Sequence, residues 1–110
     1  MTPYEAYVAI SKATGTLQKV GEKVGKSKAY VSIMRKIHRE SSQTLLDYWG
    51  IGTIPFDLVR LIVDKPKAEQ TWLVLRYLEI STGNNKKERS KARAATLKAI
   101  KENSYAQTSQ

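Results

Sequence analysis

The feature that most restricts the fold of this chain is a Gly-Lys-Ser turn between two segments with helical spacing, TLQKVGEKVGKSKAYVSIMRKI. Apolar residues recur at the spacing of one helix face on both sides of the turn: Leu17, Val20 and Val24 before it, Val31, Met34 and Ile37 after it. Thr16 and Ser27 precede the two segments as side-chain N-caps, and Gly25 supplies the left-handed residue that ends the first helix. The pattern predicts a helix-turn-helix over about 16–37.

A phosphate-binding loop is the other structure that uses a Gly-Lys-Ser sequence. That loop needs four residues between its first Gly and the Gly-Lys-Ser, and it follows a β-strand. Only three residues separate Gly21 from Gly25, and no strand-like run precedes them. The sequence therefore favours the helix-turn-helix over a nucleotide pocket.

Gly21 indicates close packing inside this motif. A glycine in the middle of a helix costs about 1 kcal/mol relative to Ala, so a compensating contact is expected. We predict that the missing side chain lets the second helix approach the first. The shared apolar seam is expected to consist of four residues, Val20, Val24, Val31 and Met34.

Positive charge is concentrated in two segments. The net charge is +9; residues 12–39 hold eight Lys or Arg against one acidic residue, and residues 86–102 hold seven against two. Residues 40–85 hold four basic and six acidic residues. Because the predicted helix-turn-helix lies in the first basic segment, the charge favours a phosphate-rich partner. A basic surface that only faces solvent is the alternative.

The rest of the sequence predicts further helices and no strand. The N-terminal TPYE carries a capping box. Supporting helices are expected over about 42–81 and a basic helix over about 86–102, followed by a flexible tail at 103–110. Together these segments predict an all-α, compact multi-helix domain of about six or seven helices, spanning residues 1–102 and built around the helix-turn-helix.

Composition argues against a metal or catalytic site. The chain has no Cys, a single His (His38) and scattered acidic residues, so neither a zinc-ligand set nor a catalytic constellation is predicted. We expect no enzymatic activity, no cofactor and no metal. Trp49, Trp72 and Tyr77 lie at helical spacing among Leu and Val, which favours core packing over base stacking. The chain has no run of 18 apolar residues and no secretory signal pattern, so we expect a cytoplasmic protein without a membrane partner.

The helix-turn-helix and the residues after it resemble the DNA-binding domain of the ParB/KorB family. Residues 25–32, GKSKAYVS, carry the Gly-Lys-Ser turn and the Tyr-Val-Ser of that family. Gly52 and Ile54 match the stretch after its short helix, and the resemblance covers roughly residues 16–80. It implies a helix-turn-helix that binds double-stranded DNA, with further helices packed on the recognition helix.

Two parts of full-length partition proteins have no counterpart here. Only about 15 residues precede the motif, and they lack the Arg-rich box of the family's nucleotide-binding domain. A separate dimerisation domain is also missing, so no nucleotide-driven clamp is expected. The resemblance then implies a stand-alone module, either a small transcriptional regulator or a partition factor of a plasmid or other mobile element, associated with nucleoid or plasmid DNA.

The first residues of a recognition helix enter the major groove. The predicted base contacts therefore lie at the start of the second helix: Ser27, Lys28, Ala29 and Ser32. The predicted phosphate contacts lie in the two basic segments: Lys19, Lys23, Lys26, Tyr30, Arg35, Lys36, Arg39, Lys86, Lys87, Arg89, Lys91 and Arg93. For Tyr30, packing against the protein is an equal alternative. For helix 86–102, a dimer contact through its Ala/Leu stripe and a solvated surface are the alternatives.

These observations predict a sequence-specific double-stranded DNA-binding protein. A homodimer on a palindromic or repeated site is expected, because two-fold dimers commonly bind paired half-sites. An RNA-binding basic protein is one alternative, and it would present exposed stacking aromatics. A protein-interaction adaptor that recruits its partner through the acidic-to-neutral middle is the other.

Overall fold

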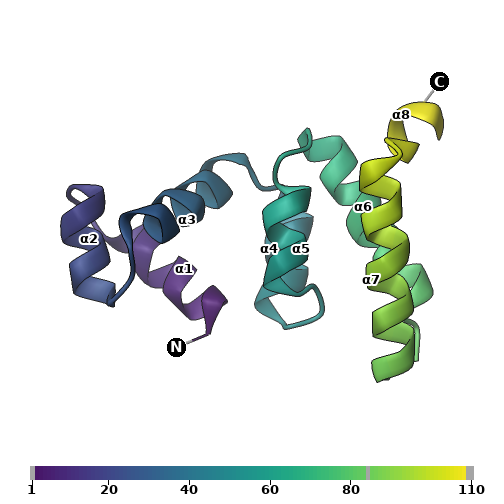
Figure 1. Cartoon of the computed structure of the whole chain (residues 1–110), viewed down its shortest axis with the longest axis horizontal. Helices are drawn as coiled ribbons and strands as arrows, with labels where there is room; N and C mark the ends of the chain where they lie inside the picture. The colour runs from purple at the N-terminus through teal and green to yellow at the C-terminus, as the bar shows by residue number, and fades with distance from the viewer. Residues whose placement is uncertain (1, 84, 109–110) are drawn as a thin grey trace. The chain divides into compact units, whose positions relative to one another are not determined.

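The computed structural model describes residues 2–83 and 85–108, and within these ranges the chain forms eight α-helices and no strand (Figure 1). The helices are α1 Pro3–Lys12, α2 Leu17–Val24, α3 Lys28–Glu40, α4 Gln43–Gly50, α5 Phe56–Ile62, α6 Lys67–Ile80, α7 Lys86–Lys101 and α8 Ser104–Thr108. The predicted all-α class is confirmed. The helix beyond the expected six or seven is α8, which lies in the segment predicted as a flexible tail.

The helices group into two units, Met1–Ser41 and Ser42–Gln110, which we call unit 1 and unit 2. The sequence suggested one domain over residues 1–102. The division falls where α3 ends and Ser42 begins the next helix as its N-cap, accepting a hydrogen bond from the backbone N–H of Leu45 at 3.1 Å. Each unit therefore has its own set of buried side chains.

In unit 1, α3 packs against both α1 and α2. The predicted capping box is present, since the backbone N–H of Glu5 donates to the Thr2 hydroxyl and the Thr2 N–H donates to the Glu5 carboxylate, each at 3.2 Å. Hydrogen bonds to the Glu5 carboxylate from Thr2, chiefly from its backbone N–H, lower the pKa of Glu5. The buried apolar side chains of this unit come from all three helices: Ala6, Tyr7, Ile10, Val20, Val31, Met34 and Ile37.

The predicted seam is therefore only part of the core of unit 1. Val20, Val31 and Met34 are buried as expected, whereas Val24 is half-buried. Val24 is the last residue of α2, directly before the turn, so it lies at the edge of the helix contact. Residues of α1 fill the space that the sequence pattern assigned to the two helices of the motif alone.

In unit 2, α4 and α5 lie side by side and α6 runs alongside α7 (Figure 1). Its buried side chains come mostly from α5, α6 and the inner face of α7: Leu45, Trp49, Ile54, Leu58, Val59, Ile62, Val63, Leu73, Val74, Tyr77, Ala92 and Ala99. The fully buried Gln70 amide accepts from the backbone N–H of Ser42 at 2.6 Å and donates to the carbonyl of Lys65 at 2.8 Å. This side chain ties the start of α4 to the start of α6.

The C-terminal segment is held by an aromatic contact. The ring of Tyr105 in α8 meets the ring of Trp72 in α6 edge-on, with 5.7 Å between centroids. Trp49 and Tyr77 are buried as predicted, but Trp72 is half-buried: it lies at the surface of α6, where Tyr105 of α8 and the Arg76 guanidinium lie against its ring.

Candidate nucleic-acid interface

The turn between α2 and α3 is built by backbone hydrogen bonds around Gly25. Gly25 has φ +72°, the left-handed conformation predicted for it. The N–H of Lys26 donates to the carbonyl of Gly21 at 2.8 Å, and the N–H of Gly25 donates to that of Glu22 at 3.4 Å. This pair of bonds is the Schellman pattern, which satisfies the last carbonyls of a helix. The turn therefore fixes the direction in which the chain leaves α2.

Gly21 faces the turn rather than the body of the second helix. A Cβ atom at this position would lie 2.4 Å from the Lys26 carbonyl oxygen. We expected the missing side chain to make room for α3. The contact that needs the space is instead the backbone of Lys26 and Ser27, and it brings α3 close to α2 by tightening the connection.

Ser27 begins α3 as its N-cap. Its hydroxyl accepts a hydrogen bond from the backbone N–H of Tyr30 at 3.2 Å, as predicted. From this start, Val31, Met34 and Ile37 point into unit 1, with exposures of 0%, 1% and 0%. The burial of that face determines which residues of α3 face solvent.

The four predicted base-contact residues share one property, which is exposure at the N-terminal end of α3: Ser27, Lys28, Ala29 and Ser32. They combine hydroxyl groups, one ammonium group and one methyl group within the first turns of a helix. Ser27 has a second role as the cap, so its side chain contributes to both stability and the surface.

Lys26 and Tyr30 interact directly. The Lys26 ammonium lies over the Tyr30 ring, 5.1 Å from its centroid. Tyr30 is half-buried, and burial raises the pKa of its hydroxyl. Both roles predicted for Tyr30 remain compatible with this position, because the ring packs while the residue stays partly exposed.

The other predicted phosphate contacts of unit 1 differ in what they touch. Lys19 and Lys23 are exposed on α2. Arg35 is half-buried, and its guanidinium donates to the carbonyl of Gly15 at 3.0 Å, which holds the loop between α1 and α2. Lys36 is also half-buried, whereas Arg39 is exposed, with 4.0 Å between its guanidinium and the Glu40 carboxylate. Lys19 and Lys23 are therefore better placed than Arg35 to meet a partner.

A contact that sequence patterns did not reveal joins α1 to the far end of α3. The Tyr7 hydroxyl lies 3.3 Å from Nδ1 of His38, and Tyr7 is buried. No local motif identifies this pair, because the two residues are 31 positions apart. It fixes α3 at its C-terminal half while the turn fixes it at the start.

The predicted phosphate contacts of unit 2 are all exposed on α7: Lys86, Lys87, Arg89, Lys91 and Arg93. Arg93 donates from Nε to the Asp57 carboxylate at 2.9 Å and so connects α7 to α5. Ala92 and Ala99, which belong to the stripe considered as a dimer contact, are buried within unit 2.

Within residues 2–83 and 85–108, no helix has the length and apolar character needed to span a bilayer. The same residues contain no cluster of three or more His, Cys, Asp or Glu side chains that would hold a metal ion. Comparison of the chain with protein-family models, with curated proteins and with solved structures finds no match. What supports a function is therefore the sequence pattern together with the arrangement of residues in unit 1.

Proposed function

We propose that unit 1 is a sequence-specific double-stranded DNA-binding module in which α3 is the recognition helix. The observation that carries this proposal is the two-sided character of α3. One face is fully buried through Val31, Met34 and Ile37, and the N-terminal end exposes small and cationic side chains. A helix held along one side and exposed at its first turns is the form in which helix-turn-helix proteins enter the major groove.

The exposed side chains suit the chemistry of base edges. Lys28 is a donor for the acceptors O6 and N7 of guanine, and the Ala29 methyl group suits the thymine methyl. Ser32 lies one turn further along the same exposed region and donates to or accepts from a base edge. Sequence preference would then come from three residues on one short stretch of helix.

The surrounding cations supply affinity that does not depend on sequence. Lys19 and Lys23 on α2 and Lys26 in the turn flank the start of α3, so they are proposed to contact the DNA backbone. Each neutralised phosphate releases counterions, and about six contacts across the two basic segments would give a slope of log affinity against log salt of roughly −5.

The resemblance of residues 25–32 to the ParB/KorB motif supports the same function. We propose a small transcriptional regulator or partition factor that acts on plasmid or nucleoid DNA. A homodimer on a palindromic or repeated site accompanies this proposal, because one helix-turn-helix contacts only a few base pairs.

A binding experiment with matched nucleic acids tests the proposal. Fluorescence anisotropy is measured with a pool of random duplex DNA and with duplex RNA of the same sequences, at several salt concentrations. We expect tighter binding to DNA, with the steep salt dependence given above. A flat salt response would remove the nucleic-acid function, and tighter binding to RNA would favour an RNA-binding protein instead.

A further inference from the structure

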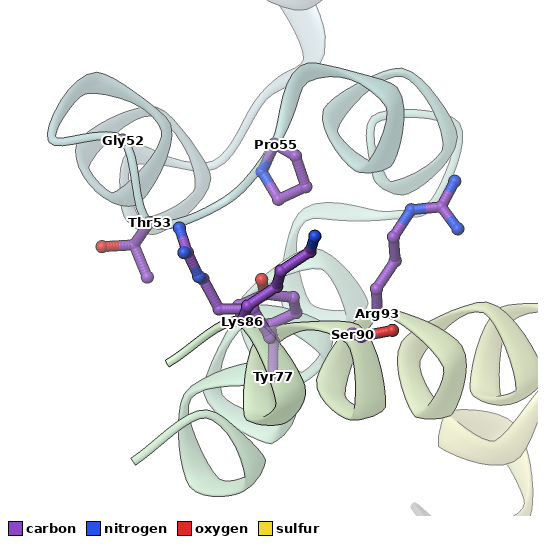
Figure 2. A pocket seen from close by; sticks show the side chains of 8 residues that line it. Gly52, Thr53, Pro55, Tyr77, Lys86, Ser90 and Arg93 are labelled. Atoms are coloured by element: carbon purple, nitrogen blue, oxygen red, sulfur yellow. The ribbon is translucent and has the colours of Figure 1, made fainter. Parts of the chain in front are cut away.

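Unit 2 contains an open pocket of about 330 Å³ that lies outside the proposed recognition helix. Its walls are the loop between α4 and α5, one residue of α6 and the N-terminal half of α7. Figure 2 shows Lys86, Ser90 and Arg93 on α7 facing the loop that carries Thr53 and Pro55. The volume falls at the lower end of the range for small-molecule sites.

The pocket wall formed by α7 is positively charged. Lys86, Arg89 and Arg93 follow one another at i, i+3 and i+7, so they share one face of the helix. Arg93 is paired with Asp57, which offsets its charge and fixes its guanidinium. In the part of the chain that the structure describes, no carboxylate forms an ion pair with Lys86 or Arg89.

Tyr77 adds a phenolic hydroxyl to the pocket wall. The residue is only 2% exposed, and Figure 2 shows its hydroxyl directed into the pocket. Among the described residues, none forms a hydrogen bond with this hydroxyl. Burial raises the pKa of Tyr77, although the charges of Arg89 and Arg93 oppose the change. The group is therefore a protonated donor at neutral pH, and it opens onto the pocket, where a ligand oxygen can accept from it.

We infer that this pocket binds a small-molecule oxyanion of the phosphate class. Lys86 and Arg89 supply the charge, and the hydroxyls of Tyr77 and Ser90 supply further donors. The two cationic groups match the charge of a phosphate, about −1.5 to −2 at neutral pH, better than the single negative charge of a carboxylate. The position of Lys86 at the first turn of α7 adds the favourable end of the helix dipole. The inference does not depend on whether unit 1 binds DNA.

An NMR titration of the full chain tests the inference. The ¹⁵N-labelled protein is titrated with inorganic phosphate and with pyrophosphate at constant ionic strength. We expect saturable shifts at the backbone amides of residues 86–93 and at Thr53. Lys86→Ala, Arg89→Ala and Tyr77→Phe should each weaken binding about tenfold, as expected for the loss of one hydrogen bond to a charged group.

Lys91→Ala is the matched control. It removes the same charge as Lys86→Ala from the same helix, but Lys91 does not line this pocket. In Lys91→Ala, the affinity for pyrophosphate should change by less than about twofold, because an exposed charge outside the pocket interacts only weakly with a ligand bound in it. Tyr77→Phe keeps the buried ring, and a thermal melt establishes that unit 2 is still folded.

Two outcomes would overturn the inference. If the shifts spread over basic residues of both units and Lys91→Ala weakens binding as much as Lys86→Ala, the anions are attracted diffusely by the positive surface and no site exists.

A short DNA duplex forms the second arm of the experiment. If the pocket amides respond to the duplex but to neither small anion, the phosphate that they recognise belongs to nucleic acid, and the small-molecule assignment is wrong.

Discussion

Replacing Gly21 with Ala tests how the turn holds the proposed recognition helix. At an ordinary position inside a helix, this change stabilises by about 1 kcal/mol. Here the new Cβ would lie 2.4 Å from the Lys26 carbonyl oxygen, well inside the 3.0 Å below which real Cβ atoms are essentially never found. The obstacle is backbone, so no side-chain rotation relieves it.

The expected loss of stability follows from the backbone shift that the new Cβ atom requires. Lys26 has to shift by at least 0.6 Å, the difference between the two distances, and this strains its 2.8 Å hydrogen bond to the Gly21 carbonyl. Overpacking of this kind costs about 1–3 kcal/mol. After the helix-propensity gain is subtracted, we expect Gly21→Ala to destabilise unit 1 by about 1 kcal/mol.

Native-state hydrogen exchange at the amides of Val31 and Met34 is the suitable assay, because both Trp residues lie in unit 2 and fluorescence would report that unit. Glu22→Ala, at the exposed neighbouring position of α2, is the control for changes in helix propensity. Faster exchange in Gly21→Ala than in the wild type is the expected result. If exchange in Gly21→Ala is instead slower, by the amount expected from the higher helix propensity of Ala alone, the proposed contact between Gly21 and the turn is refuted.

Further substitutions test other contacts. Val31→Asp should cost more than about 3 kcal/mol, because it buries an unpaired charge, and a thermal melt close to wild type would contradict its place in the core. Ser27→Ala should cost about 1 kcal/mol in the same melt through loss of the N-cap. Gln70→Ala should destabilise unit 2 by about 2 kcal/mol in urea unfolding monitored by Trp fluorescence, because buried backbone groups lose their partner. Asp57→Asn should cost less than about 1 kcal/mol, and the difference should vanish in high salt, since Asp57 and Arg93 are about half exposed.

Local features of the fold were predictable from the sequence because they depend on neighbouring residues. The caps at Thr16 and Ser27 and the left-handed Gly25 each act within a few positions along the chain. Apolar spacing likewise identified Val31 and Met34, since a helix places them on one face.

Contacts between distant segments were not predictable in this way. Tyr7 meets His38 and Arg35 meets the Gly15 carbonyl across separations of 31 and 20 residues, and no periodic pattern signals either pair. The partial burial of Arg35 follows from this packing. Sequence position alone placed Arg35 with the other candidate phosphate contacts.

The pocket in unit 2 was missed for the same reason. Its residues come from a loop near position 53, from Tyr77 and from the start of α7. Tyr77 has the sequence signature of a core residue, and it is one. Only the three-dimensional arrangement reveals that its hydroxyl end faces a cavity.

The central claim is that the start of α3 selects the DNA sequence. Its most direct test takes a duplex selected by the wild-type protein from a random library and compares it with a scrambled duplex at several salt concentrations. Lys28→Ala or Ser32→Ala should cost about 1–3 kcal/mol on the selected duplex and narrow its advantage over the scrambled one. Lys36→Ala should weaken both by similar factors and reduce the salt slope by about one. If Lys28→Ala and Ser32→Ala leave the ratio of affinities for the selected and the scrambled duplex unchanged, the claim is contradicted. The basic helix α7 would then be the better candidate for the element that selects the sequence.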